Sequence, residues 1–408
     1  MSQLDWQKAY QNRDVGWLLF NQRVLAEALD ERTPLLERLK FLAIFTSNLD
    51  EFFMKRVGIL KQRMDKVMQK SHSIKAQEAE QHLRTLRETV LPMLRQQADC
   101  FKTLLPRLAE QGIHLLSCAQ LTPAQKEEAD QFFSSNVSPA LTPLALDPGH
   151  PFPYLSNLST SLGFVLRYPE AEENVFARVK VPSILPQWVR LKSDCSPSER
   201  VYVRLHELIQ DNAASLFPGM ILEGVTLFRV ARNAEVDLDE EEAESLKALV
   251  AEELRQRRFE PVVRLEIQEG PNPWVRQLLM QKFELTELDL YEMPGELDFT
   301  GLFPIADLDR IELRDEPWTP VTPPNLTERH LDIFSAIRAG DLLVHHPFES
   351  FDASVEHFIR SAAKDPHVVA IKMTVYRVGD DTPFVRSLIQ AAESGKQVAC
   401  LIELQARF

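Results

Sequence analysis

The chain has 408 residues, about two to three times the size of a common folding unit, which predicts two or three domains. Apolar residues make up 44% of the sequence and charged residues 26%, so the chain can bury a core and global disorder is excluded. The formal net charge is −14, from 46 Lys and Arg against 60 Asp and Glu. This balance argues against a general binder of nucleic acids or acidic membranes.

Glycine and cysteine patterns exclude several common sites. None of the 13 glycines forms a GxGxxG or GxxxxGK motif, so neither common nucleotide-binding loop is present. The four cysteines (Cys100, Cys118, Cys195 and Cys400) include no CxxC pair, which excludes a zinc cage or a disulfide framework. The start lacks a signal-peptide pattern, and no apolar run reaches about 18 residues. These features favour a cytoplasmic protein without a transmembrane segment.

The first region is predicted to be a helical bundle. Apolar residues recur at helical spacing from Trp17 to about Gly112. Thr33 followed by Pro34 predicts a helix start, with Thr33 as the N-cap, and Gly112 predicts the end of the last helix. We therefore place a helical domain at residues 1–110.

A basic stretch lies within this helical region. Residues 55–70 contain six Lys and Arg residues, Lys55, Arg56, Lys61, Arg63, Lys66 and Lys70. A solvated helix face is the simpler interpretation, because charged residues normally lie outside. A groove that faces a polyanion is the alternative.

Between residues 111 and 319 the pattern changes to an α+β domain. Three segments have the residue pattern of strands, namely residues 162–167, 175–181 and 226–230. Residues 239–258 are predicted to form a charged amphipathic helix. The acidic run 237–242 resembles a metal site, but acidic residues in a first helical turn complement the helix dipole. No calcium loop centred on a glycine accompanies this run, so we favour the helix-start interpretation.

A proline-rich joint at residues 317–324 precedes the last region, residues 320–408. There, an apolar run at 368–376, a helix from Thr382 to Ser394 that Gly395 ends, and a second apolar run at 398–404 predict a strand–helix–strand unit with two buried strands. Such a unit has parallel strands, whose carboxyl ends share one edge of the sheet.

Two arginines follow these strands. Arg377 comes directly after the first run, Arg407 lies three residues after the second, and the amino end of the helix near Thr382 opens onto the same edge. Open α/β sheets bind ligands at this edge, and guanidinium groups suit phosphate oxygens. The alternative is that each arginine forms a surface ion pair, for example with Asp380 or Asp381.

Short blocks of distinctive residues occur in each region of the chain. The helical region carries WLLFNQRVL at 17–25 and SNLDEFFM at 47–54. The middle region carries blocks at 151–153, 156–159, 176–182 and 228–234, and the last region carries them at 345–351, 371–377 and 403–408. These blocks resemble the polyphosphate kinase family, and they occur in family order across essentially the whole chain.

The resemblance implies both a fold and an activity. The fold is a multidomain α+β architecture, with an N-terminal helical bundle, an α+β head domain and the start of an α/β phospholipase-D-like domain. The activity is reversible transfer of the ATP γ-phosphoryl group to an active-site histidine and then to the end of an inorganic polyphosphate chain, with Mg²⁺. The implied partners are ATP, ADP and polyphosphate, we expect a homo-oligomer, and nucleic acid is not an expected partner.

By motif, the resemblance also implies roles for three residues. Asn48 would contact ATP, and Arg377 and Arg407 would belong to a metal–phosphate cluster. Because a guanidinium is permanently cationic, we assign the two arginines to phosphate oxygens beside the ion. Outside its block, Asn48 would be interpreted as a solvated residue or a local cap. Asp50 and Glu51 are interpreted as helix-surface charges.

The family's phosphorylated histidine lies in a His-x-Lys type motif downstream of the 405–408 block. We therefore expect no catalytic nucleophile in this chain, which would be a truncated, inactive part of a longer kinase. His345 and His346 are not interpreted as nucleophiles, because the family's corresponding stretch is peripheral. The alternative is a catalytically inert fragment that binds ATP or polyphosphate, or that serves as an interaction module.

Overall fold

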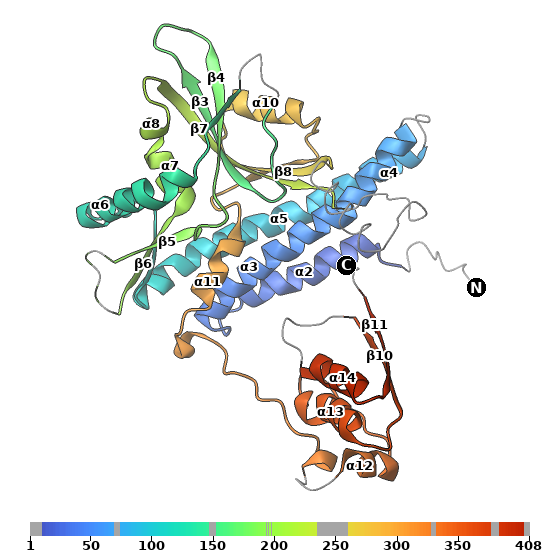
Figure 1. Cartoon of the computed structure of the whole chain (residues 1–408). Coiled ribbons are helices and arrows are strands. Elements are labelled where there is room, and N and C mark those ends of the chain that lie inside the picture. Colours follow the sequence, from blue (N-terminus) through green and yellow to red (C-terminus); the bar gives the residue numbers. More distant parts are fainter. Residues whose placement is uncertain are drawn as a thin grey trace. The chain divides into compact units, whose positions relative to one another are not determined.

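The computed structural model describes residues 10–68, 74–146, 152–192, 194, 196, 198–234, 260–327, 332–376 and 383–403. The chain divides into two compact units, residues 1–315 and 316–408. Each unit is described by itself below, with the elements labelled in Figure 1.

The first unit begins with long helices, as the apolar spacing predicts. They are α2 (Arg13–Leu29), α3 (Leu35–Phe52), α4 (Gly58–Met68) and α5 (Ile74–Glu110), and a π-helical turn (Phe53–Val57) joins α3 to α4. Helices α2, α3 and α5 pack along one another (Figure 1). Gly112 has a φ of +73° and closes α5, which confirms the predicted helix end, because glycine adopts this left-handed conformation without steric cost.

The predicted cap of α3 is wrong. The helix begins at Leu35, Pro34 occupies the N-cap position, and no side chain caps the first turn. Thr33 lies one residue before the N-cap, and its backbone N–H donates to the Asp30 carbonyl, at 3.2 Å. The carbonyl of Pro34 accepts the first bond of the helix, from the N–H of Arg38 at 3.0 Å.

Two sheets follow in the first unit. The larger sheet has the strand order β2-β4-β3-β7-β8-β9 and is antiparallel except for the β8–β9 pair. The smaller sheet has the order β1-β6-β5. The strands of the larger sheet are β2 (Leu144–Leu146), β3 (Thr160–Arg167), β4 (Asn174–Lys180), β7 (Ile221–Arg232), β8 (Val262–Gln268) and β9 (Leu290–Met293), and those of the smaller are β1 (Ile113–Leu116), β5 (Trp188–Leu191) and β6 (Arg200–Arg204).

The strands predicted in this region are confirmed as β3, β4 and β7. The helix predicted at 239–258 and the acidic run at 237–242 lie outside the described residues. Shorter helices accompany the sheets, and α10 packs its apolar side against the larger sheet (Figure 1). These helices are α6 (Pro123–Phe132), α7 (Leu205–Asp211), α8 (Ala213–Leu216), α10 (Pro273–Lys282) and α11 (Phe303–Ala306).

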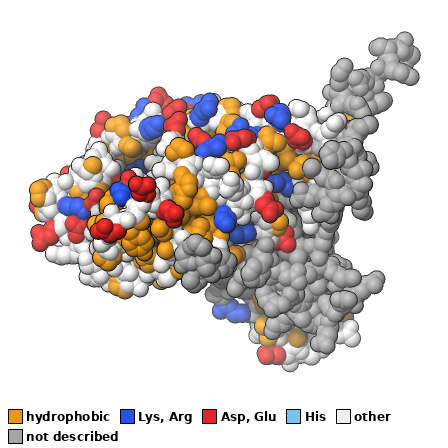
Figure 2. Space-filling view, turned by 90° about the horizontal axis from the view of Figure 1, so that it is seen from above, with side chains coloured by type: hydrophobic (Ala, Val, Ile, Leu, Met, Phe, Trp, Pro, Cys, Tyr) orange, Lys and Arg blue, Asp and Glu red, His pale blue; other side chains and the backbone are white. Residues whose placement is uncertain are grey.

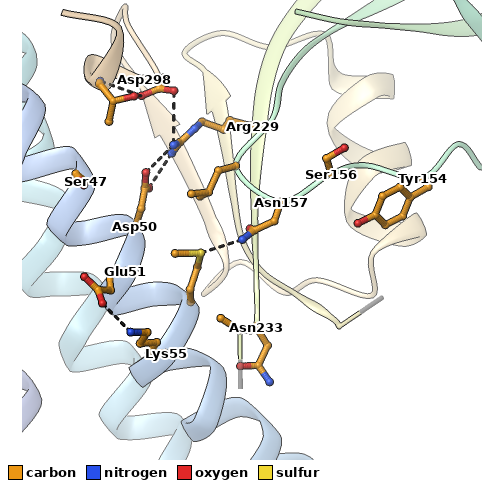
Figure 3. A pocket seen from close by; sticks show the side chains of 14 residues that line it. Ser47, Asp50, Glu51, Lys55, Tyr154, Ser156, Asn157, Arg229, Asn233 and Asp298 are labelled. Carbon is orange, nitrogen blue, oxygen red and sulfur yellow. Dashed lines mark hydrogen bonds and ion pairs between the residues drawn. The ribbon is translucent and has the colours of Figure 1, made fainter. Parts of the chain in front are cut away.

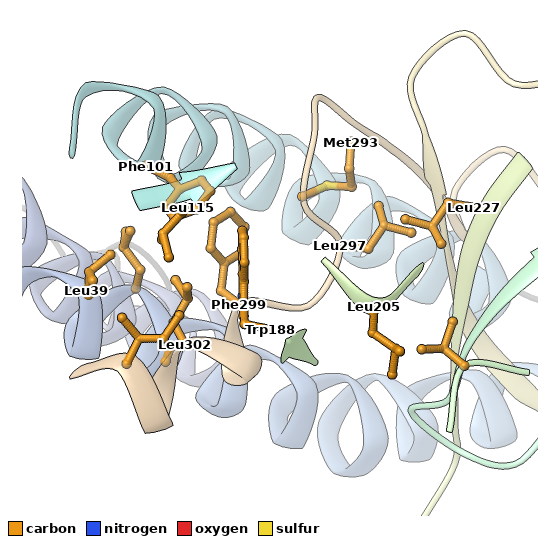
Figure 4. Close-up of a cluster of buried hydrophobic side chains, with 14 of the residues drawn as sticks. Leu39, Phe101, Leu115, Trp188, Leu205, Leu227, Met293, Leu297, Phe299 and Leu302 are labelled. Atoms are coloured by element: carbon orange, nitrogen blue, oxygen red, sulfur yellow. The ribbon is translucent and has the colours of Figure 1, made fainter. Parts of the chain in front are cut away.

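A continuous hydrophobic core joins the long helices to both sheets (Figure 4). Leu39 on α3 and Phe101 on α5 belong to the same buried cluster as Trp188 on β5 and Leu227 on β7. The ring of Phe101 meets the ring of Phe299 edge-on, with centroids 5.4 Å apart. This shared core explains why helices and sheets form one compact unit. The domain boundaries that we place at 110 and 319 stay predictions.

The second unit contains the predicted strand–helix–strand unit. Its elements are α12 (Ile333–Ala339), α13 (His357–Lys364), β10 (Ala370–Val375), α14 (Pro383–Glu393) and β11 (Gln397–Ile402). Strands β10 and β11 pair in parallel, and Gly395, with a φ of +86°, follows α14. The predicted topology is therefore confirmed.

The predicted burial of these two strands is wrong. Leu401 and Ile402 on β11 are 71% and 45% exposed, whereas Val398 packs against the cluster that contains Phe384 and Leu388 of α14. An apolar run shows what a strand can bury, but burial also requires a layer on each face. Among the described residues, helices cover only part of this two-stranded sheet.

Candidate functional site

A cavity lies in the first unit, between α3 and the larger sheet (Figure 3). Its volume is about 950 Å³. Its walls come from α3, the π-helical turn, the loop at 154–158, strand β7 with the two residues after it, and residues 298 and 300. The lining residues are Ser47, Asp50, Glu51, Met54, Lys55, Tyr154, Ser156, Asn157, Leu158, Arg229, Asn233, Ala234, Asp298 and Thr300.

The basic stretch at 55–70 contributes to this cavity. Lys55 lines the cavity and pairs with Glu51 one helical turn earlier, with Nζ and Oε1 2.7 Å apart. Further along, Lys61 pairs with Asp289 at 2.8 Å. The interpretation as a fully solvated helix face is therefore wrong for Lys55 and Lys61, while the side chain of Lys66 and all of Lys70 lie outside the described part.

A cluster of buried charges forms the wall between α3 and the sheet. Arg229 on β7 donates two hydrogen bonds to the Asp50 carboxylate, at 2.8 and 2.6 Å. Arg264 on β8 donates to Asp50 at 2.5 Å and to Glu266 at 2.9 Å. Arg229 also donates to Glu266, at 3.0 Å, and its Nη2 lies 3.7 Å from the Asp298 carboxylate, so two arginines and three carboxylates form one ionic cluster.

The interpretation of Asp50 as a helix-surface charge is therefore wrong. It is only 3% exposed, because its position on α3 faces the sheet rather than solvent. Burial opposes its ionisation, but Arg229 and Arg264 outweigh burial and hold the pKa of Asp50 below its usual value. Burial, together with repulsion from Asp50, raises the pKa of Glu266.

Some donors in the cluster are left without partners. The Nε of Arg229 and the Nε and Nη1 of Arg264 are buried and have no hydrogen-bond partner among the described residues. The guanidinium of Arg264 lies over the ring of Phe53, with its Cζ 4.4 Å from the ring centroid. This cation–π contact compensates in part for the missing hydrogen bonds.

Asn48 lies on α3 next to Ser47, which lines the cavity, but Asn48 is not itself a lining residue. It shares a helix face with Glu51 and Lys55, three and seven residues later, both of which line the cavity. The side chain of Asn48 is half-buried, and its Nδ2 donates to Oδ1 of Asn21 on α2, at 3.0 Å. Asn48 is therefore neither a freely solvated residue nor a helix cap.

The two predicted phosphate-binding arginines lie outside the described residues. Strands β10 and β11 are parallel, so their carboxyl ends share one edge of the sheet. In the sequence, Arg377 follows the end of β10 and Arg407 follows the end of β11. Asn48 belongs to the first unit and the two arginines to the second. Their assignment to one phosphate site stays a prediction.

Metal and membrane features can be assessed over the described part of the chain. There, no three His, Cys, Asp or Glu side chains gather closely enough to hold a metal ion. The described helices also include none with both the length and the apolar character to cross a bilayer. On the face that Figure 2 shows, acidic and basic side chains are interspersed, so the net negative charge does not form a single patch there.

Comparison with known proteins matches nearly the whole chain. The polyphosphate kinase N-terminal domain matches residues 10–116, the middle domain matches 124–305, and C-terminal domain 1 matches 332–408. The chain belongs to the polyphosphate kinase family. This confirms the resemblance that the residue blocks indicate, and the fold agrees with the expected multidomain α+β architecture.

Individual relatives in the polyphosphate kinase family support this assignment. A polyphosphate kinase of Synechocystis sp. is 47% identical over 98% of this chain, and one of Thermosynechococcus vestitus is 44% identical over 99%. The crystal structure of polyphosphate kinase from Porphyromonas gingivalis matches 98% of this chain with a TM-score of 0.81 and 27% identity. The chain spans 58%, 59% and 56% of the lengths of these three proteins, respectively.

Proposed function

We propose that this chain serves ATP-dependent polyphosphate synthesis, in which the γ-phosphoryl group of ATP passes reversibly to the end of an inorganic polyphosphate chain. The observation that carries the proposal is the match to three consecutive polyphosphate kinase domains in their family order. Relatives that share more than four residues in ten are named polyphosphate kinase. A second function has no comparable support.

The nucleotide is proposed to bind at the Asn48 edge of the cavity. Ser47, Ser156 and Asn157 supply hydroxyl and amide groups that suit ribose and phosphate oxygens. Lys55, which pairs with Glu51 at 2.7 Å, supplies a cation that can also attract phosphate oxygens. This arrangement can bind a nucleotide by contacts to its polar groups.

Three further features are proposals that the resemblance implies. They are a phosphohistidine intermediate on a histidine downstream of the 405–408 block, dependence on Mg²⁺, and assembly as a homo-oligomer. The described side chains include no cluster that fits a metal ion, so we derive no step through Mg²⁺ from them. Arg377 and Arg407 are proposed to neutralise phosphate charge during transfer.

A chimeric enzyme tests the proposed activity. This chain would replace the matching portion of the Synechocystis polyphosphate kinase, and polyphosphate formation from ATP would be measured. We expect activity in the chimera, and Arg377→Ala or Arg407→Ala should each remove about 2–4 kcal/mol of transition-state stabilisation. Asn48→Ala should mainly raise the KM for ATP.

A second measurement keeps this test decisive if the chimera misfolds. The 408-residue chain alone would be titrated with ATP by calorimetry. Binding is expected, and a folded chain that does not bind ATP would contradict the proposal. Acid-labile label from [γ-³²P]ATP on a histidine of this chain would show instead that the phosphorylated residue lies within it.

A further inference from the structure

Two amide side chains form a short hydrogen-bonded chain between α2 and α3. Asn21 is 0% exposed, among the apolar residues that join these two helices. Its Nδ2 donates to the backbone carbonyl of Phe45, at 3.1 Å, and its Oδ1 accepts from Nδ2 of Asn48, at 3.0 Å. Asn48 is half-buried, so the chain runs from the core to the residue that we propose contacts the nucleotide.

The chemistry of these groups allows only one direction along the chain. A backbone carbonyl can only accept, so the Asn21 atom that faces Phe45 must be the amide nitrogen. The other end of Asn21 is then its oxygen, which can only accept, so Asn48 must present its own nitrogen to it. The orientation of Asn48 is thereby fixed by an atom of the α3 backbone.

Among the described residues, the Asn48 side chain has no hydrogen-bond partner other than Asn21. Its Oδ1 can accept one hydrogen bond, and the second N–H of its Nδ2 can donate one. Adenine offers a matching pair, because its 6-amino group donates and an adjacent ring nitrogen accepts, as in the known pairing of Asn with adenine. Guanine presents an oxygen acceptor in place of the amino group, so it would face the Asn48 oxygen with an unpaired acceptor.

We infer that Asn21 is a positioning residue that fixes the amide of Asn48, so that the pair recognises adenine in preference to guanine. This inference rests on the proposed function, in which Asn48 contacts the nucleotide. It adds a residue, Asn21, that the residue blocks alone do not assign. A merely structural role for Asn21 would stabilise the helix pair without affecting the choice of base.

The test is a titration of the 408-residue chain with ATP and with GTP. We compare wild type, Asn21→Leu, Asn48→Ala and the double variant, each checked for folding by circular dichroism. A bidentate amide–base contact discriminates between bases by about 5- to 150-fold. Wild type should prefer ATP within this range, Asn21→Leu should bring the ATP:GTP ratio close to one, and the double variant should match Asn48→Ala.

Gln97→Leu is a matched control. Gln97 is a buried amide on α5 that donates to the Leu42 carbonyl and to the Thr46 hydroxyl of α3, at 2.9 and 2.7 Å. It binds the same helix but does not contact Asn48. Its replacement should lower stability while leaving the ATP:GTP ratio unchanged.

The possible outcomes separate the inference from the proposed function. If Asn48→Ala leaves the affinity for ATP unchanged, both the proposed nucleotide site and the inference are overturned. If Asn48→Ala weakens ATP binding while Asn21→Leu retains the ATP:GTP ratio, only the inference is overturned.

A further measurement on wild type covers the case in which Asn21→Leu fails to fold. The chain is titrated with ATP and with the analogue that lacks the 6-amino group. Tighter binding of ATP is expected, and equal affinity for the two overturns the inference.

Discussion

Strand β8 in the first unit and strand β11 in the second show opposite relations between residue type and burial. β8 carries the charged residues Arg264 and Glu266, which are 1% and 2% exposed. β11 carries the apolar residues Leu401 and Ile402, which are largely exposed. The sheet that contains β8 packs against α3 through the charged cluster and against α10 through apolar residues, whereas β11 belongs to a two-stranded sheet with incomplete cover.

This comparison shows that covering layers decide which side chains are buried, while residue type decides what burial costs. A buried charge is tolerated only with partners, because desolvation of an unpaired charge is expensive. The Asp50–Arg229–Arg264–Glu266 cluster therefore fixes how α3 meets the sheet. The same contact shapes one wall of the cavity, so stability and the candidate site share these residues.

The largest expected effect comes from opening the charged cluster. Asp50→Ala leaves Arg264 with Glu266 alone, and leaves Arg229 with Glu266 and the more distant Asp298. Breaking a buried ion pair costs about 3–5 kcal/mol. The free energy of unfolding would be measured by urea denaturation. Glu51→Ala is the control, because its pair with Lys55 is partly exposed and should contribute less than about 1 kcal/mol. Equal, small losses in both variants would contradict the role that we assign to the cluster.

A pair of leucine truncations tests the contrast between the two strands directly. Leu265 on β8 is fully buried, so Leu265→Ala should cost about 2–5 kcal/mol of unfolding free energy. Leu401 on β11 is exposed, so Leu401→Ala should change it by no more than about 0.5 kcal/mol. Thermal and urea unfolding of both variants would be compared. A similar cost at both positions would show that β11 is covered in solution.

A smaller effect is expected from pH in the first unit. Burial, aided by Arg204, lowers the pKa of His206 to about 4. This folded pKa lies below the unfolded value of about 6.5, so the unfolded chain binds more protons between these values. Stability should therefore fall by about 1–3 kcal/mol as the pH drops from about 6.5 to about 4. His206→Gln should reduce the difference between the unfolding free energies at pH 7 and pH 5, measured by urea denaturation. An unchanged difference would contradict the role assigned to His206.

Elements with a local signal could be predicted from the sequence. Apolar spacing predicts the helices between Trp17 and Gly112, and alternation predicts β3, β4 and β7. The strand–helix–strand unit of the second region is predicted by two apolar runs around a helix that Gly395 ends. Each of these patterns lies within a short window of the chain, where propensity and periodicity decide the structure.

The charged cluster could not be predicted in this way, because it joins residues far apart. Asp50 is 179 residues from Arg229 and 214 residues from Arg264. One local signal was available: Arg229, Arg264 and Glu266 each interrupt an apolar strand pattern, and such charges require buried partners. The sequence does not show which partner each charge finds.

Asn21 illustrates the same limit at the candidate site. The family resemblance assigns a role to Asn48 through its block, whereas Asn21 belongs to the separate block at 17–25. The packing of α2 on α3 brings the two amides together, and the sequence does not show this contact. Arg377 and Arg407 stay predictions, because they lie outside the described residues.

The most direct test of the nucleotide site is an NMR titration of the ¹⁵N-labelled chain with ATP, in which the side-chain amide signals of Asn48, Asn21 and Gln97 are assigned by substitution. We predict that ATP shifts the Asn48 signal most, the Asn21 signal less, and the Gln97 signal not at all. Saturating ATP that leaves the Asn48 amide signal in place would contradict a nucleotide site at this edge of the cavity.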